Sequence, residues 1–196
     1  MKTKMKYIYL GSLLALSPLM LSNCAHEPVT RTNAANASGS KIAADSRRAL
    51  NDLYAQNKAA RKLGRTASGI LVFPNIVKGG FVIGAEGGNG ALFNGSGGVT
   101  AYYQTAAATY GFEAGVEKYG YALFLMSPAE VRNLSEAAGW EVGSSPGFVV
   151  VNKGMVATLS TRTVDRGTYA FVFDQKGLMG GVSLKGSKIT RIHPGR

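Results

Sequence analysis

The sequence predicts an α+β fold: an N-terminal amphipathic helix packed on a mainly antiparallel, strongly curved, barrel-like sheet with one short inserted helix. Apolar residues recur at helical spacing between Ser40 and Arg65, whereas after Gly69 the apolar period becomes two, which is typical of strands. Glycine accounts for 26 of the 196 residues, about twice the usual ~7%. Glycine lets backbones approach closely and eases sharp bending of a sheet.

The N-terminal segment, residues 1–23, has the features of a signal peptide. Lys2, Lys4 and Lys6 precede an apolar run over residues 7–21, and this order is typical of secretory signals. The run is shorter than the ~20 residues that a membrane span needs. Cys24 follows it, and the segment resembles a lipobox, although Asn23 departs from the usual small residue. That resemblance implies an acylated, palmitate-bearing Cys24 and a protein anchored on the periplasmic face of a bacterial outer membrane; an ordinary secreted protein is the alternative.

The rest of the chain is predicted to be a tether and one domain. Residues 24–39 are small and polar without an apolar period, which indicates a flexible tether, and residues 40–196 are enough for a single domain. Cys24 is the only cysteine, so an internal disulfide is excluded.

The first predicted helix, residues 40–65, is strongly basic on one side. Ile42, Leu53 and Leu63 mark its apolar face, and residues 41–65 contain seven basic residues against two acids. At ~100° per residue, the basic residues of the opposite face lie within roughly 60° of one another. These are Arg47, Lys58, Lys62 and Arg65.

The net charge of +11 favours an acidic partner, either nucleic acid, anionic lipid or an acidic polymer. Export of the protein would exclude nucleic acid. The basic helix face is therefore interpreted either as a solvated surface or as an electrostatic docking surface for anionic phospholipid.

The strands are predicted from shorter patterns. Residues 70–73 form a strand that Pro74 stops, and Gly84 to Gly90 is interpreted as a hairpin connection because no helix follows to complete a phosphate loop. In residues 110–117 the apolar residues, up to Val116, alternate with small and acidic ones up to Glu117, which predicts a half-buried strand. Gly84, Gly111 and Gly115 leave one sheet face bare, so that another layer can approach.

The inserted helix has the clearest local signal. Ser127, Pro128 and Glu130 form a capping box with proline at the first helical position, and Gly139 is expected to end the helix. Turns are then predicted at residues 152–154, 174–177 and 185–187.

Catalytic and metal-binding patterns are absent from the sequence. His26 and His193 are the only histidines and have no ligand spacing, and neither lies in a nucleophile motif. Glu113 and Glu117 share a strand face ~13 Å apart, too far to act as a pair. With Glu86, they are expected to be partners for surplus Lys and Arg. No catalytic residue, metal or cofactor is predicted, and the protein is not expected to be an enzyme.

Several separated blocks resemble the SYLF (Ysc84-like) domain family. They are GILVFP at 69–74, KGGFVIG at 78–84, GWEVG at 139–143 and FVFDQKGLMGGVSLKGS at 171–187. The resemblance covers roughly residues 43–192, and Lys185 stands where members often carry Glu. It implies lipid binding in which an N-terminal amphipathic helix takes part. The basic residues in that region are Arg47, Arg48, Lys58, Arg61, Lys62 and Arg65.

Two functions remain open from the sequence. The first is a lipid-anchored, non-catalytic envelope protein that binds anionic phospholipid through the basic helix. The second is an envelope structural or interaction protein that binds a protein partner or peptidoglycan.

Overall fold

The computed structural model describes residues 37–137, 139–144, 147–151, 166–177, 184 and 186–195. The predicted signal peptide with Cys24, most of the predicted tether and the predicted turn at 152–154 lie outside the described residues. Within the described ranges, no helix has the length and apolarity needed to cross a membrane.

The N-terminal helical region consists of two helices, α2 (Gly39–Gln56) and α3 (Lys58–Gly64). Ser38 caps α2, and its side-chain oxygen accepts a hydrogen bond from the backbone N–H of Lys41 at 3.3 Å. Asn57 separates the helices because its backbone is extended (φ −131°, ψ 104°) while its side chain accepts from the N–H groups of Ala59 and Ala60. The prediction of one continuous helix over 40–65 is therefore wrong, since Asn57 ends α2 and caps α3.

A long hairpin forms the centre of the sheet. β1 (Gly69–Asn94) pairs antiparallel with β2 (Val99–Leu125) along almost its whole length. On its other side, β2 pairs with β6 near its start and with β5 near its end, and the path through the sheet is β3-β6-β2-β5-β4. The shorter strands are β3 (Trp140–Glu141), β4 (Phe148–Val151), β5 (Thr168–Gly177) and β6 (Lys188–Ile192).

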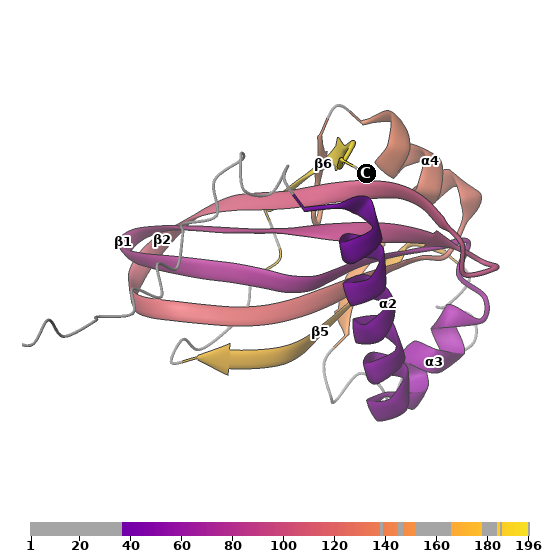
Figure 1. Cartoon of the computed structure of the whole chain (residues 1–196), viewed down its shortest axis with the longest axis horizontal. Helices are drawn as coiled ribbons and strands as arrows, with labels where there is room; N and C mark the ends of the chain where they lie inside the picture. The colour runs from indigo at the N-terminus through magenta and orange to yellow at the C-terminus, as the bar shows by residue number, and fades with distance from the viewer. Residues whose placement is uncertain are drawn as a thin grey trace, which may run out of the picture.

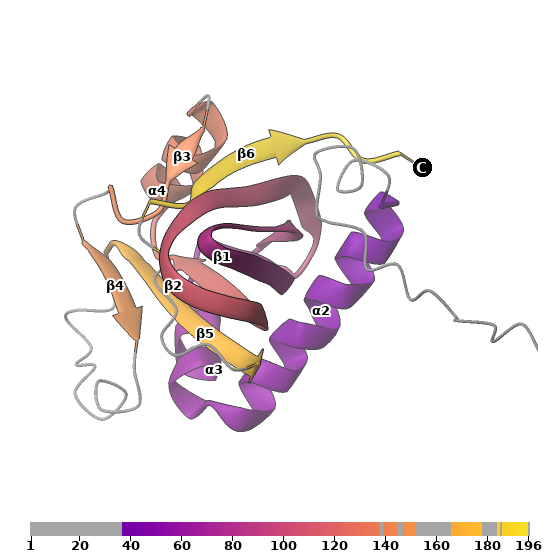
Figure 2. The ribbon, with the colours of Figure 1, turned by 90° about the vertical axis from the view of Figure 1, so that its left-hand side faces the viewer.

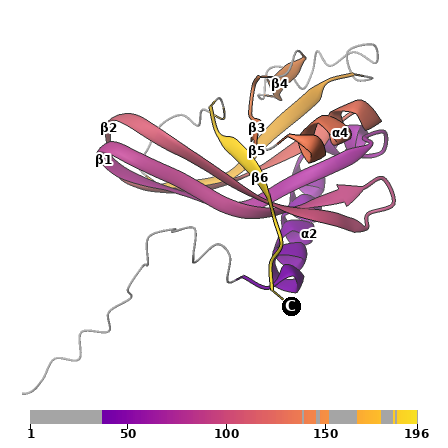
Figure 3. The ribbon, with the colours of Figure 1, turned by 90° about the horizontal axis from the view of Figure 1, so that it is seen from above.

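The predicted fold class is confirmed. The sheet is strongly curved, α2 crosses one side of it, and the hairpin bends far from α3 and α4 (Figures 1 and 2). All pairings are antiparallel except that of β4 with β5. The C-terminal end lies beside the start of α2 (Figure 3), where the backbone N–H of Gly39 donates to the carbonyl of Gly195 at 3.1 Å.

Glycines bring the two halves of β1 into contact. A Cβ on Gly90 would overlap the carbonyl oxygen of Val72, and one on Gly88 would overlap that of Asn75. At Gly84 a Cβ would lie 2.7 Å from the carbonyl oxygen of Gly79. The close approach predicted at Gly84 is thus confirmed, and the approaching layer is the first half of the same strand.

Three predictions about strand boundaries are wrong. Pro74 does not stop the first strand, because it lies at a register shift between Phe73 and Ile76 that removes the need for its missing N–H. Residues 84–90 lie inside β1, and the hairpin turn is at 95–98. Residues 174–177 belong to β5, although Asp174 has a positive φ of 53°.

The expected burial of one strand segment is reversed. Val116, predicted to face inward, is 51% exposed, whereas Glu117 is 1% exposed. Glu117 lies opposite Lys78 in the β1–β2 register, and Lys78 is also buried. The bend of the hairpin therefore has a partly polar interior, which alternation of apolar residues does not indicate.

The helix α4 (Pro128–Glu136) confirms its capping prediction. The Ser127 hydroxyl accepts from the N–H of Glu130 at 3.3 Å, and Pro128 is the first helical residue. The helix ends at Glu136, earlier than expected, and Gly139 follows with a φ of 147°.

The apolar core lies on both faces of the curved sheet. The face covered by α2 and α3 contains Leu53, Leu63 and Phe124. The opposite face contains Leu123, with Leu134 of α4 and Trp140 of β3 packed over it. Consecutive residues of β2 thus point into different clusters, and α2 and α3 are fixed by their apolar sides.

Candidate functional site

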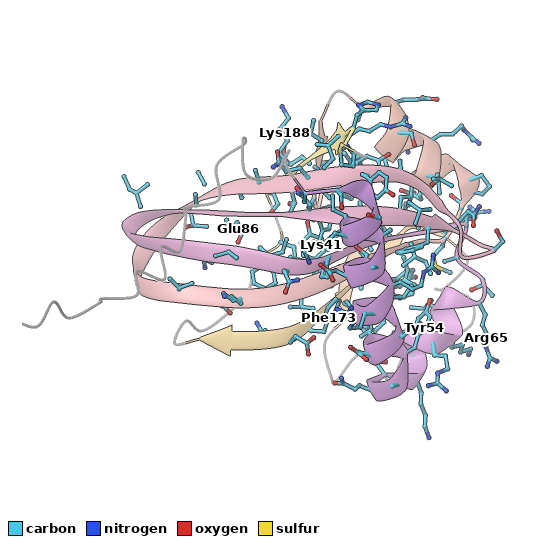
Figure 4. All side chains as sticks on the ribbon, viewed as in Figure 1. Lys41, Tyr54, Arg65, Glu86, Phe173 and Lys188 are labelled. Atoms are coloured by element: carbon cyan, nitrogen blue, oxygen red, sulfur yellow. The ribbon has the colours of Figure 1, made fainter. Side chains whose placement is uncertain are left out.

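The break at Asn57 divides the predicted basic residues into two groups. Lys58, Arg61 and Lys62 belong to α3, and Arg65 is the residue that caps its C-terminal end. We call these four residues the α3 cationic face. All four are exposed, and Figure 4 shows Arg65 at the outer edge of the molecule beside α3.

The α3 helix presents its cations outward because its apolar residues are fully used in the core. Ala60 is 0% exposed and Leu63 is 2% exposed, and α3 contains no acidic residue. Arg61 donates from Nε to the carbonyl oxygen of Tyr54 at 3.0 Å. Between the described side chains, Lys58, Lys62 and Arg65 make no ion pair or hydrogen bond. This surface therefore carries uncompensated positive charge.

The basic residues of α2 have partners within the protein. Arg47 donates from Nη2 to the carbonyl oxygen of Gly97 at 3.0 Å, and its guanidinium lies 5.0 Å from the centre of the Phe93 ring. Arg48 pairs with Asp45 at 3.2 Å, and Lys41 pairs with the same carboxylate at 2.6 Å. The prediction that Arg47 shares a continuous helix face with the α3 cations is wrong because the helix is interrupted between them.

The start of α2 and the α3 cationic face lie at opposite ends of α2 (Figure 1). With 18 residues in α2, this separation is about 27 Å at ~1.5 Å per residue. The chain therefore enters the domain at Ser38, about one length of α2 away from the α3 cationic face.

A buried polar cluster inside the curved sheet is not evident from the sequence. Glu86 is 8% exposed, and its two carboxylate oxygens accept hydrogen bonds from the hydroxyls of Tyr119 at 2.9 Å and Ser187 at 3.0 Å. Figure 4 shows Glu86 on the hairpin, away from α3. Among the described residues Glu86 makes no ion pair with Lys or Arg; its partners are the hydroxyls of Tyr119 in β2 and of Ser187, the residue before β6.

The cluster raises the pKa of two tyrosines. Burial raises the pKa of Tyr119 far above its ordinary value, and the negative charge of Glu86 and the hydrogen bond to it raise it further. Burial also raises the pKa of Tyr121, and the neighbouring Thr105 hydroxyl offsets only part of this effect. Both phenols therefore stay protonated, so that Tyr119 acts as a hydrogen-bond donor and not as a base.

Glu117 is expected to pair with a Lys or Arg, and Lys78 lies directly opposite it in the β1–β2 register. The side chain of Glu113 lies outside the described residues.

The described ranges hold no group of three or more His, Cys, Asp or Glu side chains that could bind a metal ion. The six predicted lipid-binding residues are thus placed as two groups, and their role in binding stays a prediction.

Comparison with known proteins identifies part of the chain. Residues 106–193 match the family model Ysc84, described as Las17-binding protein actin regulator. This family is associated with lipid or actin-related binding and is a family of binding domains. The search of curated proteins finds no match. The matched segment begins within β2, so α2 and α3 precede it. The match to the Ysc84 (SYLF) family model at residues 106–193 agrees with the resemblance predicted from the sequence.

Proposed function

We propose that this protein is a non-catalytic, lipid-anchored protein of the bacterial envelope that binds anionic phospholipid through the α3 cationic face. The observation that carries this proposal is the local charge: four exposed cations lie together, no acid interrupts them in α3, and three have no polar partner among the described side chains. The family association with lipid-related or actin-related binding supports a binding role.

The magnitude of the expected attraction is sufficient for reversible docking. Each Lys or Arg near an anionic bilayer contributes ~1 kcal/mol, so the four residues together would supply about 3–4 kcal/mol. This attraction decays over a Debye length of ~8 Å at physiological salt. Because Ala60 and Leu63 are buried in the core, α3 has no free apolar side to insert. Binding should therefore be electrostatic and strongly salt-dependent.

The anchor in this proposal is an acylated Cys24 on the periplasmic face of the outer membrane. The tether of residues 24–37 would span roughly 20 Å on average, at ~5–6 Å times the square root of its length. Since α2 separates Ser38 from α3 by about 27 Å, a tether near its average span favours an α2 that lies nearly parallel to the bilayer. Anchor and α3 would then hold the domain at two points.

The alternative is an envelope protein that binds a protein partner or peptidoglycan. The matched family, described as Las17-binding, favours a protein partner. Such binding would not require lipid charge, and the two functions are separable by one experiment.

The test is co-sedimentation of the chain 24–196, with Cys24→Ser to remove the acylation site, using vesicles of zwitterionic lipid alone or with added anionic lipid. We expect binding only to the anionic vesicles, and a progressive loss of binding between 50 and 300 mM salt, on the order of tenfold or more. Equal binding to both vesicle types, or binding unaffected by salt, would contradict the electrostatic proposal.

A further inference from the structure

A pocket of about 210 Å³ lies among the start of β1, the β1–β2 turn, α4 and β6. Its lining combines an apolar wall, which includes Leu92 and Val131, with polar side chains. These are Ser68, Asn94, Thr100, Ser135 and Arg191. Arg191 is the only charged residue of the lining. The pocket is separate from the buried cluster around Glu86 and from the α3 cationic face.

Arg191 gives the pocket an uncompensated positive charge. Its side chain is exposed, and it makes no ion pair or hydrogen bond to any side chain that the structure describes. A guanidinium presents five N–H donors in a planar arrangement that binds phosphate or carboxylate with two parallel hydrogen bonds. The charged end of a ligand in this pocket should therefore be an oxyanion.

The hydroxyl groups of the lining indicate which polar groups the uncharged part of the ligand should carry. Ser135 donates to the carbonyl of Val131 at 2.8 Å, Thr100 to that of Leu92 at 3.3 Å, and Ser68 to that of Met126 at 3.4 Å. Because each hydroxyl has one hydrogen and it is used within the protein, these three hydroxyls offer the pocket only their acceptor lone pairs. A ligand that complements them must carry its own hydroxyl donors.

We propose that this pocket binds the phosphate ester of a small polyol, with the phosphate on Arg191 and the polyol hydroxyls donating to Thr100 and Ser68. The volume of about 210 Å³ equals that of roughly seven liquid waters at ~30 Å³ each and lies below the ~300 Å³ of pockets for drug-sized ligands. It suits a glycerol phosphate. Leu92 and Val131 contact its carbon atoms.

A polyol phosphate occurs either as a phospholipid head group or as a free ester. Ser68 lies three residues after Arg65, so the pocket and the α3 cationic face are separate sites that lie close together in the sequence. The identification of the ligand as a lipid head group rests on the proposed function, whereas the chemistry of the pocket does not.

The direct test is a titration of the ¹⁵N-labelled chain 24–196, with Cys24→Ser, with sn-glycerol 3-phosphate, inorganic phosphate and glycerol. We expect saturable amide shifts around Ser68 and Thr100 with glycerol 3-phosphate, weaker binding of inorganic phosphate, and no saturation with glycerol. Arg191→Gln should weaken glycerol 3-phosphate binding at least tenfold. The matched control is Arg132→Gln, which removes an exposed charge of α4 outside the pocket and should leave the affinity unchanged.

A second variant tests the hydroxyl argument without removing a charge. Thr100→Val should weaken glycerol 3-phosphate but leave inorganic phosphate nearly unaffected, because only the ester carries the polyol hydroxyls that would donate to Thr100. The pocket proposal is overturned if no saturable shifts appear, if Arg191→Gln binds as the parent does, or if both arginine variants lose affinity equally.

Vesicles distinguish the two sources of the ligand. At equal charge density, a head-group ligand predicts that Arg191→Gln binds phosphatidylglycerol vesicles less well than the parent while binding phosphatidylserine vesicles equally. A free-ester ligand predicts no change on either vesicle. If the parent chain binds anionic vesicles in a salt-dependent way but does not bind glycerol 3-phosphate, the pocket proposal alone is rejected. If it binds glycerol 3-phosphate but not anionic vesicles, the α3 proposal alone is rejected.

Discussion

Tyr119 and Tyr121 follow each other on the same face of β2, yet their hydroxyls have different surroundings. The hydroxyl of Tyr119 donates to Glu86 at 2.9 Å. That of Tyr121 is buried and has no hydrogen-bond partner of ordinary geometry among the described residues. Loss of a hydroxyl that satisfies a buried carboxylate removes a charge-assisted hydrogen bond, while loss of an unsatisfied hydroxyl removes only a desolvated polar group. The two phenols are therefore a matched pair for measuring the buried cluster.

At neutral pH, Tyr119→Phe should lower the free energy of unfolding by about 1–3 kcal/mol, because Glu86 loses one of its two donors. Tyr121→Phe should be neutral or slightly stabilising. Urea unfolding followed by circular dichroism measures both values. Equal destabilisation by the two substitutions would show that Glu86 does not depend on the hydrogen bond from Tyr119.

The same residues predict how stability changes at alkaline pH. Both phenols have folded-state pKa values above the ordinary 10.0, so above about pH 10 the unfolded chain loses protons that the folded chain keeps. The stabilisation is complete below that pH and declines as the pH rises, by up to ~1.4 kcal/mol per pH unit for each phenol. Tyr121→Phe should therefore show a shallower decline than the parent in unfolding measured from pH 9 to 11. An identical slope would contradict the raised pKa of Tyr121.

The element that determines the shape of the sheet is β1, whose two halves pack against each other through glycine. Gly90 and Gly88 face the carbonyl groups of Val72 and Asn75 without room for a Cβ. Gly79 lies in the same strand, but its nearest neighbour to a Cβ is the carbonyl oxygen of Gly115 at 3.8 Å, an ordinary contact. The bend of β1 therefore requires glycine at particular positions, such as 88 and 90, and not a high glycine content in general.

Gly90→Ala should therefore destabilise the fold by about 2 kcal/mol or more, because the strand halves must separate. Gly79→Ala should be neutral or stabilising by ~0.4–1 kcal/mol through the entropy of the unfolded chain. Thermal unfolding of the two variants beside the parent measures the difference. Similar melting temperatures for both would mean that the halves of β1 are not in contact.

Elements with local signals could be predicted from the sequence, and those that depend on distant contacts could not. The capping box at Ser127 acts within four residues, so α4 is predicted correctly. Asn57 is also a local signal, since asparagine is a strong N-cap, but the apolar period that continues through it hides the break. The reversal at Val116 and Glu117 depends on Lys78 across the sheet, which the pattern of one strand does not contain.

The candidate site shows the same limit. The basic residues are visible in the sequence, yet their separation depends on Asn57 and on the contact of Arg47 with Gly97, 50 residues away. The bond between Glu86 and Ser187 joins residues 101 positions apart, and the pocket at Arg191 combines side chains from four parts of the chain. Charge could be predicted, whereas its distribution over the surface required the fold.

At the scale of the whole molecule, the proposed lipid binding depends on which exposed cations have no polar partner among the described residues. The α2 cations are held by Asp45, by Gly97 and by the ring of Phe93, so within the N-terminal helices the α3 cationic face is the part left to act on a partner. Exposed cations elsewhere, Lys118, Arg132 and Lys188, provide a control set of the same charge. A general attraction of a basic protein to an acidic surface would depend on both sets equally.

The most direct measurement compares two triple variants of the chain 24–196 with Cys24→Ser on anionic vesicles at 100 mM salt. Lys58→Glu, Lys62→Glu and Arg65→Glu together should lower vesicle affinity by at least tenfold, while circular dichroism and melting temperature stay near those of the parent. Lys118→Glu, Arg132→Glu and Lys188→Glu, which change the net charge by the same amount, should lower it only a few-fold. Equal losses in the two triple variants, or full binding by the first, would contradict a lipid-binding surface on α3.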